Sequence, residues 1–178
     1  MAASAIAPVV VGTAFGGEIS NPQAHQVATP VHEAAAVRSD PGLTLAPLQA
    51  VRGKVPFRIL APHVIEHTST LTSLEPVRAF KPVPFKHELV VTFVTGAGNV
   101  YWQVIETDWN DAPILRRPTG KYTLKDGRKV DLYTNGGHVH MVVLRRGKAS
   151  YWVVNTLRDE LSNETMLAIA KGLLPLGK

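Results

Sequence analysis

The 178-residue chain contains no cysteine, which excludes disulfide bonds and cysteine-ligated metal sites. It also lacks any apolar run near the roughly 18 to 20 residues that a membrane-spanning helix needs. No G-x-S-x-G motif, phosphate-binding glycine loop or H-E-x-x-H motif is present. The sequence patterns of acyl transfer, phosphoryl transfer and metalloprotease chemistry are therefore missing. We expect neither enzymatic activity nor a bound cofactor.

Charge of one sign is not concentrated anywhere along the chain. Nineteen basic and fourteen acidic residues give a net charge of +5, and arginines are adjacent only at Arg116-Arg117 and Arg145-Arg146. Because a long basic run is absent, we do not expect nucleic acid as a partner. A mildly positive protein instead suits proximity to anionic wall polymer or to a membrane surface. Arg116 and Arg117 are candidate binding residues for such a partner.

Residues 1–50 are predicted to be a flexible segment rich in alanine and proline. Residues 1–17 are small and apolar, but the first basic residue is Arg38, so they fit either a degenerate export segment or an apolar tail. Four prolines interrupt the rest of the segment, at Pro22, Pro30, Pro41 and Pro47. We expect at most one short helix there, around Val31–Val37, and a folded domain over residues 51–178.

The pattern of residues 51–178 predicts short antiparallel strands. Asp126-Gly127 and Asn135-Gly136 supply the positive φ angles that tight hairpin turns need, and Gly96-Ala97-Gly98 marks another turn. Prolines in the first segment suggest an edge position for it. Extended segments are expected over 55–62, 72–80, 87–95, 99–106, 121–124, 129–134, 138–145 and 149–154, separated by an irregular loop over 108–119. Together they predict a curved antiparallel sheet built as a meander of hairpins.

One C-terminal helix is predicted to close this sheet. Ser162 or Asn163 is a suitable N-cap, and Gly172 and Pro175 end the helix. Apolar residues recur at helical spacing and should pack on one face of the sheet: Met166, Ile169, Ala170 and Leu173. The expected fold class is therefore α+β.

Aromatic residues are the leading candidates for a binding surface. The pair Tyr-Trp occurs twice, as Tyr101-Trp102 and Tyr151-Trp152, and neighbouring residues of a strand point to opposite faces. One ring of each pair is expected in the core, and the other either forms a platform for a sugar ring or covers the sheet. Trp109 falls in the irregular loop, where it is either a surface anchor or a plug for the open end of the sheet.

His138 and His140 are the candidate metal ligands. Residues two apart on a strand share a face, so these imidazoles could reach one metal ion. A third ligand would have to come from another strand, from Asp131, His87 or Glu88. The alternative is a half-exposed polar stripe on the face opposite to three residues that would point to the core: Val139, Met141 and Val143.

Few carboxylates are close together in the sequence. Glu106 and Asp108 are the pair that would suit acid and base roles. Carboxylates at the end of a strand are usually solvated, which is the alternative interpretation.

Several segments carry a resemblance to a known family: Phe57–Pro62, Tyr101–Val104, Asp111–Leu115, and most specifically Tyr151–Leu157 with Leu161–Met166. Residues 54–174 resemble the C-terminal accessory domain of LytR-CpsA-Psr (LCP) family proteins, which attach glycopolymers to peptidoglycan in Gram-positive bacteria. The ending of strand, loop and helix is also similar to extracytoplasmic domains of anti-sigma-like proteins. Residues 1–50 are too few and too rich in proline to encode the LCP catalytic domain, so no catalytic residue carries over.

The resemblance implies an extracytoplasmic protein associated with the cell envelope, secreted or anchored. The leading hypothesis is a non-catalytic domain that binds or positions cell-wall glycopolymer or an envelope partner protein. One alternative is a small-ligand or metal-binding protein that uses the face of His138 and His140. Another is an accessory subunit of an LCP-type transferase encoded as a separate chain.

Overall fold

The computed structural model describes residues 34–96 and 100–177, and it shows an antiparallel sheet with two short α-helices. The predicted α+β class, with a helix near the C-terminus, is confirmed. The elements are β1 (Val37–Ser39), α1 (Leu45–Val51), η1 (Arg52–Lys54), β2 (Leu60–Pro62), β3 (Val64–Glu66), β4 (Thr70–Leu71), β5 (Val77–Phe80), β6 (Glu88–Val94), β7 (Tyr101–Thr107), η2 (Pro113–Leu115), β8 (Gly120–Thr123), β9 (Lys129–Asn135), β10 (His138–Arg146), β11 (Ala149–Val154), α2 (Asn163–Lys171) and β12 (Leu173–Pro175).

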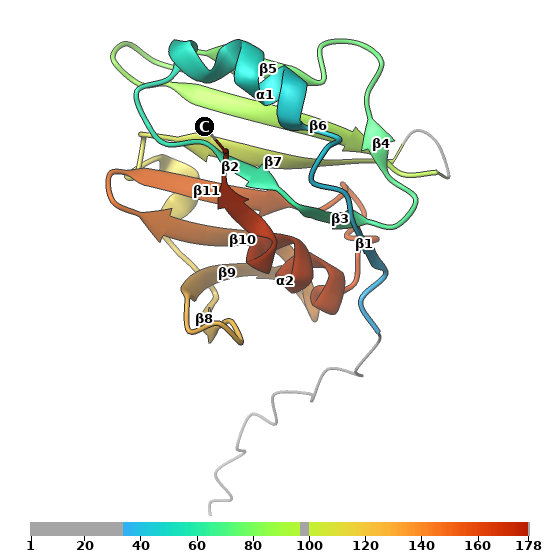
Figure 1. Cartoon of the computed structure of the whole chain (residues 1–178). Helices are drawn as coiled ribbons and strands as arrows, with labels where there is room; N and C mark the ends of the chain where they lie inside the picture. The colour runs from blue at the N-terminus through green and yellow to red at the C-terminus, as the bar shows by residue number, and fades with distance from the viewer. Residues whose placement is uncertain (1–33, 97–99, 178) are drawn as a thin grey trace, which may run out of the picture.

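The main sheet has eight antiparallel strands (Figure 1). Its order is β4-β6-β7-β11-β10-β9-β8, and β5 pairs with β6 further along the edge that β4 occupies. The predicted turns at Gly127 and Gly136 have glycine at positive φ, and so does the turn between β10 and β11, at Gly147. The central residues of the predicted turn at 96–98 lie outside the described residues.

The strands do not follow one another as a single meander, in contrast to the prediction. β6 and β7 form a hairpin, but the neighbour of β7 on its other side is β11. Residues 108–119 connect β7 to the far edge of the sheet, and β8 to β11 then return strand by strand to β7. Turn residues define which strands form hairpins, but they do not specify the partner of a strand that precedes a long loop.

One face of the sheet, here called the inner face, is covered by both helices and by β2 and β3 (Figure 1). α2 packs against β10 and β11, and α1 packs against β5. β2 pairs with β12 and β3 pairs with β1, so two small sheets lie over the large one. β2 thus has a partner on one side only, as expected of an edge strand, but it belongs to a small two-stranded sheet and not to the main sheet. The main core lies between these covering elements and the large sheet, and both sides contribute to it. It includes Leu60, Ile65, Leu89, Val91, Phe93, Trp102, Val104, Val142, Leu144, Tyr151, Val153, Met166 and Ile169.

Ordered structure begins before the predicted domain boundary at residue 51. β1 and α1 both precede it, and Leu48 of α1 is fully buried in the core. Pro47 is compatible with α1 because the first N–H groups of a helix have no acceptor within it. The predicted helix around Val31–Val37 falls partly outside the described residues, and its last residue, Val37, begins β1.

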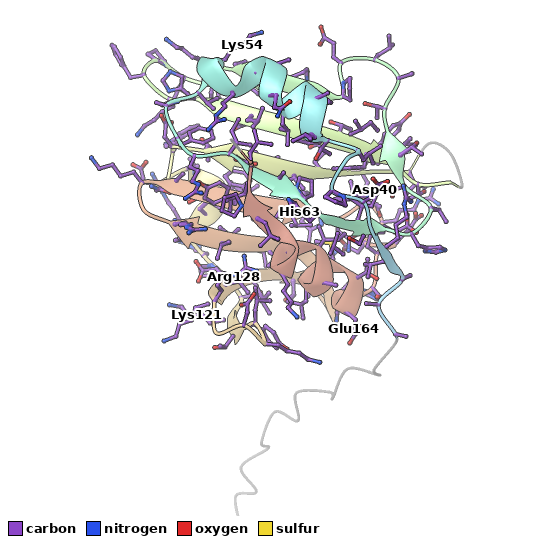
Figure 2. All side chains as sticks on the ribbon, viewed as in Figure 1. Asp40, Lys54, His63, Lys121, Arg128 and Glu164 are labelled. Carbon is purple, nitrogen blue, oxygen red and sulfur yellow. The ribbon has the colours of Figure 1, made fainter. Side chains whose placement is uncertain are left out.

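α2 forms as its sequence predicts. Ser162 is the N-cap, and its hydroxyl accepts a hydrogen bond from the N–H of Thr165 at 3.2 Å. The predicted apolar stripe of Met166, Ile169, Ala170 and Leu173 is buried. At the other end, Arg128 donates to the carbonyl oxygens of Lys171 and Leu173, as expected for a cation beside a helix C-terminus (Figure 2).

Gly172 marks the closest approach between the end of α2 and the segment that contains β3. A Cβ atom at this position would lie 2.6 Å from the Cβ of Val64. The carbonyl oxygen of Gly172 accepts a hydrogen bond from the N–H of His63 at 2.9 Å, so the backbone there cannot retreat without losing that contact. Only glycine fits this position.

We therefore predict that Gly172→Ala lowers the free energy of unfolding by about 1 to 3 kcal/mol, the usual cost of overpacking a core. Thermal or urea unfolding measures this change. Gly53→Ala is the matched control, because nothing lies within 4 Å of a Cβ at position 53. An equal effect of both substitutions would contradict the steric explanation.

Candidate functional site

An open part of the sheet surrounds Tyr101 on the outer face, opposite the helices. Trp102 points into the core from the next position of β7, so alternation places Tyr101 outside, where its exposed fraction is 49%. Its ring lines two neighbouring hollows in the surface, one on each side. We call these two hollows together the Tyr101 face.

The first hollow has a volume of about 620 Å³ and opens widely to solvent. Arg78 of β5, Thr92 of β6 and Gln103 of β7 form its floor, together with Tyr101. The Gln103 amide donates to the Thr92 hydroxyl at 3.1 Å, which fixes the orientation of both groups. Its rim is the loop before β5, which contributes Thr72, Ser73, Leu74 and Glu75.

The second hollow, of about 330 Å³, lies between Tyr101 and the loop that follows β11. Thr156, Leu157, Arg158 and Glu160 line its far side. Asn155 holds this loop, because its buried amide oxygen accepts from the N–H groups of Thr156 and Leu161 while its nitrogen donates to the carbonyl oxygens of Val139 and Leu161. The loop is therefore a fixed wall built on the core.

Asp159 anchors the same loop from its other end. Its backbone adopts a positive φ of 54°, and its buried carboxylate lies 2.7 Å from Nδ1 of His140. The amide of Asn135 donates to the second carboxylate oxygen at 3.2 Å. His140, predicted as a metal ligand, thus contacts the loop that lines the second hollow.

The structure does not bring the candidate metal ligands together. Among the described residues, no group of three or more His, Asp or Glu side chains is placed to hold a metal ion. A β-bulge at His140 shifts the register of β10, so Val139 pairs with Thr134 and Met141 with Tyr133. As a result, Val139 packs in the main core, whereas Met141 and Val143 pack on the outer face, and the predicted shared orientation of these three is wrong.

Of the five predicted aromatic binding residues, four are held by packing. Trp102 stacks on Phe93 with ring centres 4.1 Å apart, and its Nε1 donates to the buried hydroxyl of Ser69. Tyr151 is buried on the inner face, and its hydroxyl donates to the carbonyl oxygen of Arg58 at 2.7 Å. These two rings belong to the core and cannot form a surface platform.

Trp152 and Trp109 belong to a second, smaller core on the outer face. The loop over residues 108–119 packs Ala112 and Leu115 onto Trp152, Met141 and Val143, and the partly buried Trp109 lies against this cluster. Trp109 therefore packs on the outer face of the sheet and does not project freely as a surface anchor. Both rings of the second Tyr-Trp pair are buried because both faces of β11 are covered.

Arg116 and Arg117 are exposed at the end of η2 but line neither hollow. Their loop is fastened to the other half of the sheet, where Leu115 accepts a hydrogen bond from the Tyr133 hydroxyl at 2.9 Å. The structure thus separates these arginines from Tyr101.

Glu106 and Asp108 do not form an acid–base pair. Glu106 is fully buried on the inner face, where it accepts a hydrogen bond from the N–H of Leu60. Burial raises the pKa of Glu106 well above its usual range. Asp108 instead accepts from the N–H and Nδ1 of His87. Burial opposes ionisation of Asp108, but these hydrogen bonds keep its pKa below its usual value.

The raised pKa of Glu106 predicts a specific pH dependence of stability. The folded state keeps the proton at pH values where the unfolded state has lost it, so the stabilising contribution is complete below the usual pKa of 4.5 and is lost as the pH rises toward the folded pKa. In Glu106→Gln, this decline in the free energy of unfolding should disappear. Urea unfolding of both proteins from mildly acidic to alkaline pH measures it, and parallel curves would refute the assignment.

Sequence reasoning identified Tyr101 but missed the other groups of the Tyr101 face. Arg78, Thr92 and Gln103 are isolated polar residues in three strands, and only the strand register brings them together. Leu74 and Leu157 carry the clearest signal in hindsight, because each is an apolar residue in a polar loop. Their exposed fractions are 85% and 99%.

The fold and site define an antiparallel α+β domain with an open aromatic surface. No family model, curated protein or solved structure matches this chain. Among the described residues, no helix is long and apolar enough to span a membrane.

Proposed function

We propose that this protein is a non-catalytic, extracytoplasmic domain that binds or positions cell-wall glycopolymer through the Tyr101 face. The observation that carries the proposal is the exposed Tyr101 ring between two hollows whose walls present hydroxyl, amide, guanidinium and carboxylate groups. The resemblance of residues 54–174 to LCP accessory domains supplies the expected cellular setting.

The chemistry of the Tyr101 face matches that of a saccharide. The C–H face of a sugar ring packs on an aromatic ring, while its hydroxyls need donors and acceptors placed around that ring. Thr92 and Gln103 provide donors and acceptors beside Tyr101 in the first hollow. In the second hollow, Arg158 provides donors and Glu160 provides acceptors. Because the hollows lie on both sides of one ring, a chain of several sugars could cross them.

Charge on the Tyr101 face is balanced. Glu75 and Arg78 line the first hollow, and Arg158 and Glu160 line the second. Hydrogen bonding and stacking, rather than net attraction to an anionic polymer, should therefore dominate binding. Such binding should persist at moderate salt, where interactions between exposed charges are screened.

We predict that Tyr101→Ala weakens binding to insoluble wall material carrying its polymer by about fivefold to thirtyfold, since stacking on one ring and its buried area is worth about 1 to 2 kcal/mol. Co-sedimentation of the full chain with walls, before and after removal of the polymer, measures this change. Tyr122→Ala is the matched control, because Tyr122 is exposed to a similar extent, 41%, but lies on the far edge strand β8.

Equal binding by the two variants would exclude the Tyr101 face as the glycan site. Binding by the unaltered protein that disappears at moderate salt would leave only charge to explain the association, and it would also contradict the proposal.

An envelope protein is the second candidate ligand, and it is favoured by the exposure of Leu74 and Leu157 on opposite sides of Tyr101. Exposed apolar side chains of this size are more typical of protein contacts than of sugar contacts. The double substitution Leu74→Ser and Leu157→Ser distinguishes the two ligands. Glycan binding should survive it, whereas recovery of a specific partner from envelope extracts should be lost.

A further inference from the structure

A second unusual surface lies at the opposite end of β6, in the loop that joins β5 to β6. We call residues 80–86 the Phe85 loop. Phe85 has an exposed fraction of 89%, and Phe80 at the start of the loop is also exposed. Pro82, Val83 and Pro84 lie between them, so the loop is apolar apart from its two lysines.

The turn at the tip holds Phe85 outward in a conformation that glycine would adopt more easily. The N–H of Lys86 donates to the carbonyl oxygen of Val83 at 3.2 Å, which closes a four-residue turn. Pro84 occupies the second position and Phe85, with a φ of 66°, the third. This pattern is that of a type II turn, whose third position favours glycine. A phenylalanine there strains the backbone and exposes its ring to water, so folding stability does not explain its presence.

Basic groups accompany the two phenylalanines. Lys81 and Lys86 flank the apolar residues, and the guanidinium carbon of Arg78 lies 5.9 Å from the centre of the Phe80 ring. Residues 80–86 contain no acidic side chain. Close behind them, Glu88 is partly buried, and the carboxylate of Asp108 is bound by His87. The loop itself therefore presents aromatic rings beside two lysines, while the carboxylates of Glu88 and Asp108 lie near Arg78 and Lys86 behind it.

We propose that the Phe85 loop docks the domain on an anionic lipid bilayer, with Phe85 and Phe80 inserted at the headgroup boundary. Aromatic rings beside lysines are the usual combination for shallow attachment, because the rings enter the interface while the cations remain among the anionic headgroups. The lysines favour lipid over a protein surface as the occupant because they match the charge of anionic headgroups.

The tip of the Phe85 loop lies at the end of β6 that is remote from Tyr101, although Arg78, which contacts Phe80, also lines the first hollow. Glu88 begins β6 beside the Phe85 loop, and Val94 pairs with Tyr101 at the far end of the same strand, about 20 Å away at about 3.3 Å per residue. A domain attached through the Phe85 loop would thus hold the Tyr101 ring away from the bilayer. The lipid proposal does not depend on the glycan proposal.

The test is co-sedimentation of the full chain with vesicles of phosphatidylglycerol and phosphatidylcholine in equal parts, compared with phosphatidylcholine alone. We expect preferential binding to the anionic vesicles, and a loss of about tenfold to a hundredfold in Phe85→Gly, the effect of withdrawing one phenylalanine ring from the interface. Because glycine suits the turn, the same variant should unfold at an unchanged or higher temperature. Ile114→Ala removes an exposed apolar side chain elsewhere and should bind vesicles normally.

The lysines provide a second, independent readout. Replacing both Lys81 and Lys86 by alanine should weaken binding to anionic vesicles by about fivefold for each lysine and reduce its sensitivity to salt. In Phe85→Trp, the tryptophan emission should shift to shorter wavelength when anionic vesicles are added. The apolar residues 1–17 are the same in every variant, so differences between variants report on the loop.

Absence of binding to anionic vesicles would overturn the proposal in favour of a protein partner for the loop. Unchanged binding by Phe85→Gly, or an unshifted emission of Phe85→Trp in the presence of bound vesicles, would also overturn it, because both would place the ring outside the lipid.

Discussion

The hydrogen bond from the N–H of Leu60 to the carboxyl group of Glu106 fixes the layer that covers the sheet. Glu106 lies on the central strand β7, and its neighbour on β11, Tyr151, donates to the carbonyl oxygen of Arg58 in the same covering segment. These two buried contacts position β2, which then pairs with β12. The end of α2 must in turn approach this segment so closely that only Gly172 fits beside Val64.

This arrangement leaves the outer face as the place where a ligand can bind. The inner face is filled by the helices, β2 and β3, and its centre is occupied by the main core. On the outer face, the loop over residues 108–119 covers β9, β10 and part of β11 through its own small core. The end of the sheet around Tyr101 stays open. The position of the candidate site is therefore set by where the long loop crosses the sheet.

Local signals in the sequence were sufficient for most of the fold. Turn glycines, strand alternation and the Ser162 cap predict the bounds of β6 to β11 and of α2 closely. They did not give the pairing of β7 with β11, because that depends on the route of a loop without regular structure. The segment before residue 51 was misjudged for a related reason. Its few apolar residues, such as Leu48, are enough to order the segment because they pack against the inner face of the sheet.

The candidate site was predictable to the extent that it depends on alternation. Tyr101 and Trp102 were expected on opposite faces, and the structure places one outside and the other in the core. The same rule held for Tyr151 and Trp152, which also lie on opposite faces, but it could not indicate that the second face of β11 is covered as well. It failed for His138 and His140 because the bulge at His140 changes the alternation that the prediction assumed.

Backbone strain links the two proposed surfaces. Tight turns between β8 and β11 use glycine at positive φ, whereas the described residues that reach positive φ without being glycine are Glu75, Phe85 and Asp159. Glu75 lines the first hollow, Asp159 anchors the loop of the second, and Phe85 forms the tip of the loop proposed to meet lipid. Such conformations cost about 1 to 2 kcal/mol each for most residues.

The backbone strain at Asp159 is compensated by contacts of its side chain, whereas the strain at Phe85 is not. Asp159 tolerates the left-handed region better than most residues, and its carboxylate contacts His140 and Asn135. Phe85 has neither advantage, since its side chain is apolar and almost entirely exposed. Its cost is therefore not recovered within the folded chain. A strained and exposed phenylalanine points to a contact outside the chain. The physical case for a binding surface is therefore stronger for the Phe85 loop than for the Tyr101 face.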